Sequence, residues 1–246
     1  MSLATQLRVI VHQVQGMDNL GSIARVMTNF GFTDLWVTDP VTRDFADAQR
    51  MAVHSAHILA GMHVRDTLSQ ALGEVVYVVG TTSREDAQTR LKLEPEAAVH
   101  RLWELSARGR VALLLGGERR GLSDEELAHC DDVVVIPTRP EQPSMNLAQA
   151  AAVMLYLASR VGPTPLPALE LPPLAHHRVL EVLEAKMRET LGGVGYLNPQ
   201  QEDLVLRELV AALKRSRLTQ REAELWVNAF KHLARATAAT PLDRGQ

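Results

Sequence analysis

The chain has 246 residues, of which 46% are hydrophobic and 22% are charged, a balance typical of an ordinary folded protein. Its single cysteine, Cys130, excludes an intrachain disulfide and leaves too few thiols for a zinc cluster. Met1–Ile10 lacks the pattern of a secretory signal, and the longest apolar run, Ala150–Ala158, is too short to span a membrane. We therefore expect a cytoplasmic protein.

The formal net charge of −3 argues mildly against a nucleic-acid partner. The charges are unevenly distributed, however. Residues 176–246 carry 11 Lys and Arg against 9 acidic residues, whereas residues 1–160 carry 15 against 19. The C-terminal part is therefore the relatively basic part of the chain, which weakens this objection.

Short apolar runs that alternate with helical patterns predict an α/β domain with a mainly parallel sheet. A first helix is expected to begin near Asp18 or Asn19 and to end before Gly31, which suits a left-handed cap. Ser123 and Glu126 have the spacing of a capping box at the start of another helix. The last helix of the domain should run from about Met145 to Arg160. The expected strands are Arg8–Val14, Leu35–Thr38, Val75–Gly80, Val111–Gly116 and Val133–Thr138.

Five prolines between Val161 and Ala175 predict a linker, because proline disfavours both helix and sheet. We therefore expect a domain over residues 1–160, a linker over 161–175 and a small helical domain over 176–246. Three amphipathic helices should pack together there, on Leu180, Leu183, Met187 and Leu191, on Leu206, Leu209 and Leu213, and on Trp226, Phe230 and Leu233. Asn198-Pro199 with Gln201, and Thr219 with Glu222, are the start signals of the second and third.

Three junctions between expected strands and helices carry residues suited to ligand binding. In the first, Asn19 and Arg25 lie in the opening turns of a helix and can contact a ligand. The alternative is that Asn19 only caps this helix and that Arg25 is a solvated side chain. This junction has neither a dinucleotide fingerprint nor a phosphate-binding loop of the Walker type. In the second, Gly116 and Gly117 allow the backbone to approach a ligand closely. The alternative there is a glycine turn with surface charges.

The third junction, Ile136–Leu147, contains three prolines and places Ser144 and Asn146 near the start of a helix. A hydroxyl and an amide there can contact a ligand. The alternative is that Ser144 only caps the helix, but Asn146 has poor helix propensity, which favours a specific role for it.

In combination, the three segments resemble the SpoU-type members of the SPOUT methyltransferases. The matching motifs are Asn19-x-Gly21-x-x-x-Arg25, Gly117-Glu118-x-x-Gly121-Leu122 and Ser144-x-Asn146-Leu147. The resemblance covers about Leu7–Arg160, and the appended helices resemble those of the TrmJ-like transfer RNA ribose methyltransferases. It implies a parallel sheet threaded as a trefoil knot and flanked by helices, with a small C-terminal all-helical domain. It also implies a homodimer.

The resemblance further implies 2′-O-methylation of a ribose in RNA with S-adenosylmethionine as cofactor, on transfer RNA and at anticodon-loop nucleotide 32. Arg25 would act as the base or, since a guanidinium is hardly ever neutral, would grip a phosphate and polarise the hydroxyl. Asn19 would support it, and Glu118, Ser144 and Asn146 would arrange the substrate and the loops. The cofactor contacts implied are Thr81, Thr82, Ser83, Gly116, Gly117, Ile136, Ser144 and Met145, the last standing where leucine is more usual.

RNA contacts are expected at Arg119, Arg120 and Arg139, and in the basic helical part at Lys214, Arg215, Arg217 and Arg221, which otherwise form a solvated helix end. No metal is expected, because neither the pair His54 and His57 nor the pair His176 and His177 has further ligands at a recognisable spacing. Two alternatives stay open: a ribosomal RNA 2′-O-methyltransferase of the same fold, and a non-catalytic RNA-binding protein.

Overall fold

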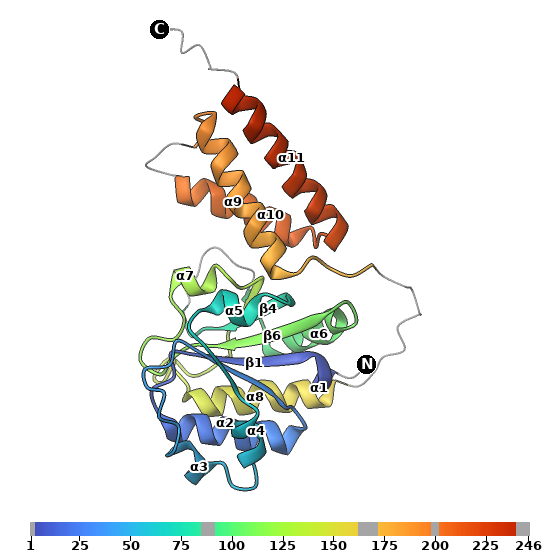
Figure 1. The fold of residues 1–246 in the computed structure, drawn as a ribbon. Helices are drawn as coiled ribbons and strands as arrows, with labels where there is room; N and C mark the ends of the chain where they lie inside the picture. Colours follow the sequence, from blue (N-terminus) through green and yellow to red (C-terminus); the bar gives the residue numbers. More distant parts are fainter. Residues whose placement is uncertain (1–2, 85–91, 162–171, 198–201, 240–246) are drawn as a thin grey trace. The chain divides into compact units, whose positions relative to one another are not determined.

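The computed structural model describes residues 3–84, 92–161, 172–197 and 202–239. The chain divides into two compact units, residues 1–170 and 171–246 (Figure 1). Within the described residues, no helix is long and apolar enough to cross a membrane.

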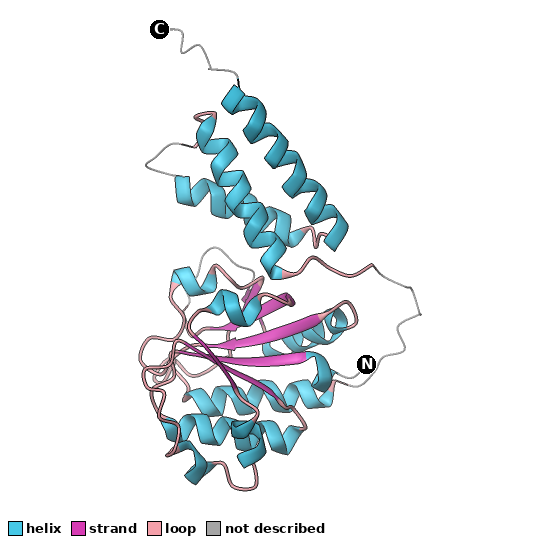
Figure 2. Ribbon diagram, in the orientation of Figure 1, coloured by secondary structure: helices cyan, strands magenta, loops and turns pink. Residues whose placement is uncertain are grey.

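The first unit is built on a seven-stranded sheet in which every pairing is parallel, in the order β3-β2-β1-β6-β4-β7-β5 (Figure 2). This confirms the α/β fold with a parallel sheet. All five expected strands are present, and the short β3 and β5 are additional. The strands are β1 (Leu7–His12), β2 (Asp34–Thr38), β3 (His63–Arg65), β4 (Val75–Thr81), β5 (Lys92–Leu93), β6 (Arg110–Leu115) and β7 (Asp132–Val134).

The strand β7 is shorter than expected, because pairing stops before Pro137, which cannot donate a ladder hydrogen bond. From there the chain runs as a loop to α8 (Leu147–Arg160). All the strands point in the same direction, so the loops that follow β1, β4, β6 and β7 leave the sheet at one edge. The candidate site is built at this edge.

Helices cover both faces of the sheet. On one side lie α2 (Met17–Phe30) and α8, which pack side by side, together with α6 (Pro95–Ser106) (Figure 1). On the other side lie α5 (Leu68–Leu72) and α7 (Asp124–Leu127). The short helices α1 (Leu3–Gln6), α3 (Ala48–Met51) and α4 (Ala56–Ala60) complete the unit.

This double cover explains why the strands are continuous apolar runs instead of alternating ones. Every residue of β1 is buried. One hydrophobic cluster joins the sheet to α5 and α7, and includes Ile10, Val78, Leu114, Leu72 and Leu127. Burial of such side chains is the main favourable term in folding the unit.

The caps of α2 correct one expectation and confirm another. The helix begins at Met17 after Gly16, so Asn19 is not its cap. It ends at Gly31, whose φ of 79° lies in the left-handed region that glycine adopts easily. The capping box at α7 is confirmed, since Ser123 Oγ accepts from Glu126 N and Glu126 Oε2 accepts from Ser123 N.

A partly buried group of ion pairs joins residues at the starts of three strands. Arg8, which is 5% exposed, donates to Asp34 at 3.1 Å, and Arg110 donates to the same carboxylate at 2.6 Å. The Arg8 guanidinium also lies 3.8 Å from the centroid of the Trp36 ring. Burial lowers the pKa of Arg8, while Asp34 acts in the opposite direction. The group thus ties β1, β2 and β6 together.

The second unit consists of α9 (His177–Gly193), α10 (Glu202–Arg215) and α11 (Gln220–Ala239). Leu183 and Met187 of α9 pack with Leu206 and Val210 of α10, and Val227 and Phe230 of α11 join this core. The expected capping box of α11 is present, as Glu222 N donates to Thr219 Oγ1 and Thr219 N donates to Glu222 Oε2. The other start signal, at residues 198–201, lies outside the described residues.

Two details of this unit differ from the expectations. Trp226 and Leu233 are 44% and 52% exposed, so the buried face of α11 is formed by Ala223, Val227 and Phe230 instead. The helical period predicted the right helix and placed Phe230 correctly, but Ala223 and Val227 contribute to the buried face while Trp226 and Leu233 do not. In addition, Leu174 of the expected linker forms an isolated bridge with Thr219 and belongs with the helices.

Candidate active site

A cavity of about 270 Å³ opens at the edge of the sheet where β4, β6 and β7 end. Its walls come from the loops after these three strands and from the first turns of α8. Binding at the carboxyl ends of parallel strands is general for open α/β sheets.

The glycine loop, residues 116–121, forms one wall. Gly121 N donates to Gly117 O at 2.9 Å, and Gly121 has a φ of 65°. A Cβ on Gly116 would stand 2.4 Å from the carbonyl carbon of Gly121, which no real contact allows. The loop therefore folds back on itself so tightly that residue 116 must be glycine.

The cavity brings together all the cofactor contacts that the resemblance implies: Thr81, Thr82, Ser83, Gly116, Gly117, Ile136, Ser144 and Met145. The rest of the lining mixes apolar side chains such as Leu147 with hydroxyl groups such as that of Thr138. Such a lining suits a ligand with both an aromatic and a polar part.

A chain of hydrogen bonds joins the three motifs. The Glu118 carboxylate accepts from Gln15 N at 3.0 Å, from Gly16 N at 2.9 Å and from Asn19 Nδ2 at 3.1 Å. Asn19 Oδ1 in turn accepts from Asn146 Nδ2 at 2.9 Å. Residues more than 100 positions apart in the sequence thus form one network.

Asn146 also caps α8. Its Oδ1 accepts from Ala148 N at 2.9 Å and from Gln149 N at 3.2 Å. This explains why a residue of poor helix propensity stands here, and it shows that the capping role considered for Ser144 belongs to Asn146. Ser144 is exposed and lines the cavity.

Arg25 is exposed on α2 and is not among the residues that line the cavity. Within the described part of the chain it has no hydrogen bond or ion pair. Arg119 and Arg120 do line the cavity, and Arg139 is exposed on the loop before α8. The structure thus brings four of the five proposed catalytic residues together and leaves Arg25 apart from them.

The basic residues expected to contact RNA in the second unit gather at the junction of α10 and α11. Lys214 and Arg215 form the last turn of α10, and Arg221 lies in the first turn of α11. Arg217, between them, has a φ of 52°, in the left-handed region. Arg215 and Arg221 are exposed.

Sequence reasoning missed three residues beside the glycine loop: His12, Gln13 and Glu126. His12 is 5% exposed and Glu126 is 8% exposed, both unusual for polar side chains. Glu126 was identified only as part of a capping box. Nothing in the linear sequence indicated that His12 would meet it, because 114 positions separate them.

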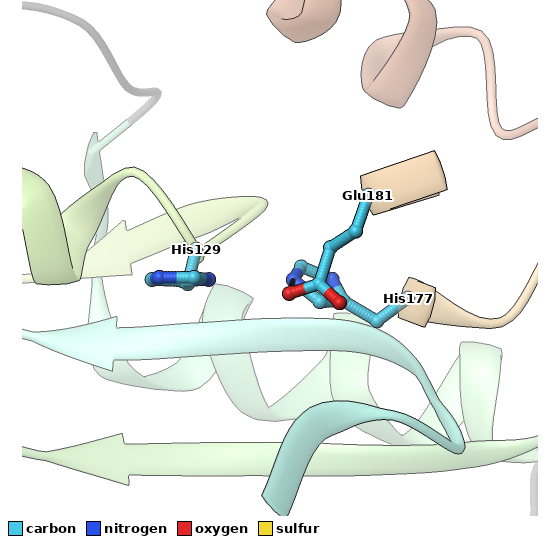
Figure 3. A group of neighbouring side chains, drawn as sticks. All are labelled: His129, His177 and Glu181. Atoms are coloured by element: carbon cyan, nitrogen blue, oxygen red, sulfur yellow. Dashed lines mark ion pairs between the residues drawn. The ribbon is translucent and has the colours of Figure 1, made fainter. Parts of the chain in front are cut away.

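His177 and Glu181 were missed as a pair. They lie one turn apart on α9, with Nε2 and Oε1 separated by 3.9 Å, and Figure 3 draws both with His129 of the first unit. A protein metal site needs three or four ligands, so this pair on α9 supports no metal proposal.

Comparison with known proteins identifies the family. Residues 6–156 match the model of the SpoU rRNA Methylase family, so the chain belongs to this family. The chain is 29% identical over 225 residues to the tRNA (cytidine/uridine-2′-O-)-methyltransferase TrmJ of Cronobacter sakazakii, covering 89% of this chain and 92% of that protein. It is 32% identical over 232 residues to the tRNA (cytidine/uridine/adenosine-2′-O-)-methyltransferase TrmJ of Pseudomonas aeruginosa, covering 89% and 90%.

The fold is similar to that of two solved structures. The crystal structure of TrmJ from Z. mobilis ZM4 matches with a TM-score of 0.82 at 27% identity, over 92% of this chain and 98% of that one. A putative methylase family protein from Neisseria gonorrhoeae matches with a TM-score of 0.67 at 27% identity, over 74% and 94%. These matches confirm the resemblance to the SpoU-type methyltransferases.

Proposed function

We propose that this protein methylates a ribose 2′-hydroxyl in transfer RNA with S-adenosylmethionine. The observation that carries the proposal is that the second and third motifs, distant in sequence, line one cavity at the edge of the sheet, and that Asn19 of the first motif is hydrogen-bonded to both of them. The names of the relatives support the reaction and the substrate, and these relatives match both units of the chain.

The residues of the cavity fit the cofactor. The glycine loop offers backbone groups at close range, and the tight approach at Gly116 leaves no room for a side chain there. Apolar side chains such as Ile136 and Leu147 suit an adenine ring, while the hydroxyls of Thr81, Thr82 and Ser144 suit polar groups. Bound there, S-adenosylmethionine would supply an electrophilic methyl group on a sulfonium.

The protein's own groups would orient the ribose and its hydroxyl. Glu118, which accepts three hydrogen bonds, fixes the first junction, and Asn19 and Asn146 extend this rigid frame to α8. Ser144 would contact the ribose from the cavity wall. Arg25 would grip the phosphate next to the target and polarise the hydroxyl.

We also propose a homodimer. Arg25 is exposed on α2, away from its own chain's cavity lining, and a second copy is the partner that would allow it to act at a site. Phe30 of α2 and Tyr156 of α8 form an edge-to-face pair with centroids 5.7 Å apart, and Tyr156 is 50% exposed. This face suits contact with an identical copy.

The first unit would then be the catalytic domain, threaded as a knot, and the helical unit would add contacts to transfer RNA through Lys214, Arg215, Arg217 and Arg221. A transfer RNA substrate also supports the cytoplasmic location. The target that the TrmJ-like resemblance implies is nucleotide 32 of the anticodon loop.

Methylation of total RNA with labelled cofactor, followed by mapping of the modified nucleotide, tests the proposal. We expect the label in transfer RNA, on a 2′-oxygen at position 32. Label confined to ribosomal RNA would favour the alternative substrate, and cofactor binding without any transfer would favour a non-catalytic RNA-binding protein. Label on a base would contradict the reaction itself.

A further inference from the structure

Arg120 belongs to the glycine loop, yet it bonds to the protein's own side chains. Its Nη2 donates to Glu126 Oε1 at 2.7 Å and to Gln13 Oε1 at 3.0 Å. Only 11% of the Glu126 side chain is exposed, against 57% of the Arg120 side chain. A hydrogen bond to a shielded carboxylate is stronger than an ion pair in open solvent, so this contact restrains Arg120.

Glu126 holds further elements in place at the same time. Its Oε1 faces His12 Nε2 at 3.1 Å, and its Oε2 accepts from Ser123 N at 2.7 Å. The other ring nitrogen of His12 lies 2.9 Å from Thr38 Oγ1. An ionised carboxylate only accepts hydrogen bonds, so His12 donates to it. Glu126 thereby connects Arg120 to the ends of β1 and β2.

Gln13 completes the connection to the glycine loop. Its φ of 53° is left-handed, a strained conformation for a residue with a side chain. The backbone N of Gln13 donates to Thr38 O, and its Nε2 donates to Asp39, both at 2.8 Å. A Cβ on Gly117 would stand 2.7 Å from Gln13 O, so the glycine loop packs directly on this residue.

We propose that Arg120 is a positioning residue for the cofactor: through Gln13 and the buried Glu126, it holds the glycine loop in its ligand-binding shape and does not contact RNA. Arg120 stands between Gly117 and Gly121, whose hydrogen bond closes the loop along the cavity. The inference rests on the proposed function and revises the expected role of Arg120. Arg119 lines the same cavity and, among the described residues, has no hydrogen bond or ion pair, so it remains a candidate RNA contact.

Arg120→Met and Arg119→Met form a matched pair, since each removes one charge from neighbouring positions. We expect Arg120→Met to weaken S-adenosylmethionine binding in the absence of RNA by about ten-fold, as measured by calorimetry. The KM for transfer RNA at saturating cofactor and its salt dependence should stay as in the wild type. Arg119→Met should leave the affinity for S-adenosylmethionine unchanged, but it should raise the KM for transfer RNA and weaken the salt dependence of that KM. Arg120→Lys should recover most of the affinity, because an ammonium can donate to both oxygens.

Whether Arg120 acts through Glu126 is tested with Glu126→Gln and with the double variant that combines Glu126→Gln and Arg120→Met. Since both residues act in one chain of contacts, the double variant should bind cofactor no more weakly than the weaker single variant. Additive losses would overturn that route. Unfolding curves check that Glu126→Gln folds, and the Arg120 variants alone decide the main point if it does not.

Unchanged cofactor affinity in Arg120→Met would overturn the proposal, as would a raised KM for transfer RNA with a weaker salt dependence. These outcomes differ from a failure of the proposed function. If the proposed function is wrong, the wild-type protein itself does not bind S-adenosylmethionine. If only the role of Arg120 is wrong, the wild type binds S-adenosylmethionine and Arg120→Met binds it equally well.

Discussion

Arg25 is exposed on α2 and lies outside the cavity lining of its own chain. If it contacts the phosphate next to the reacting ribose, Arg25→Ala should lower kcat about 100-fold or more, the usual loss for one charge-stabilising donor. Cofactor affinity should stay within a few-fold, because Arg25 does not touch the cavity. Single-turnover kinetics and calorimetry measure the two quantities.

Arg25→Lys is the sharper variant, since it keeps the charge but loses the forked donor geometry. We expect it to be almost as inactive as Arg25→Ala. Near-normal turnover in the alanine variant would rule out a role for Arg25 in the reaction.

Gly116 offers a second test at the scale of one residue. A methyl group there would stand 2.4 Å from the backbone of Gly121 and 2.5 Å from Leu122 N, so the loop must open. Overpacking costs about 1–3 kcal/mol, and Gly116→Ala should therefore weaken cofactor binding by about ten-fold or more. Gly73→Ala is the matched control in the same unit, because its Cβ would only meet Ser69 O at an ordinary 3.5 Å. Equal affinity in both variants would show that the loop is adaptable.

At the scale of the helix, Asn146 does two things that can be separated. Asn146→Asp keeps an acceptor for Ala148 N and Gln149 N but loses the donor to Asn19, whereas Asn146→Ala loses both. Removing a cap costs about 1 kcal/mol, so only the alanine variant should lower the free energy of unfolding. Both variants should lose activity if the link to Asn19 matters. Denaturant unfolding and methylation assays distinguish the two roles, and full activity in Asn146→Asp would remove the link from the mechanism.

The ion pair at the starts of β1, β2 and β6 makes a stability prediction. Asp34→Asn leaves Arg8 nearly buried without its carboxylate, and breaking a buried pair costs about 3–5 kcal/mol. Because Arg43 and Asp66 form an exposed pair, with 62% and 74% of their side chains exposed, Asp66→Asn is the control and should cost little. The midpoint of urea unfolding measures the loss of stability in each of the two variants. Equal midpoints would mean that the hydrogen bond to Ala71 O and the Trp36 ring suffice to hold Arg8.

At the scale of the whole molecule, the basic junction of the helical unit should act on RNA and not on the cofactor. Replacing Lys214, Arg215 and Arg217 with Gln should weaken transfer RNA binding and reduce its salt dependence by about one unit of slope per lost phosphate contact. S-adenosylmethionine binding should not change. Binding assays over a range of salt concentrations measure the slope. If transfer RNA binding is normal at every salt concentration, the helical unit serves stability or dimerisation instead.

Oligomeric state is the other property at this scale. Light scattering should give a dimer for the wild type, and Tyr156→Glu should shift it toward monomer, because a charge on this half-exposed ring is costly to bury. A fully active monomer would remove the dimer from the mechanism.

Much of this protein could be predicted from its sequence, because the signals concerned are local. Continuous apolar runs gave the five main strands, and the glycine at position 31 and the spacing of Ser123 with Glu126 gave the caps. The second and third motifs identified residues that line the cavity, and the first identified Asn19, which is hydrogen-bonded to both. Each motif follows the end of a strand, and parallel strands end at one edge. The short strands β3 and β5 were missed because two or three residues carry too little pattern.

Only the tertiary structure decided which residues meet. That Glu118 holds the backbone at Gln15 and Gly16, and that Asn19 bonds to Asn146, depends on strand order, which no local pattern encodes. The same holds for His12 and Glu126, whose burial together near the glycine loop turned Arg120 from an expected RNA contact into a proposed positioning residue. Sequence determines the chemical groups a protein has, but hydrogen bonds act over about 3 Å, so the fold alone determines which groups interact.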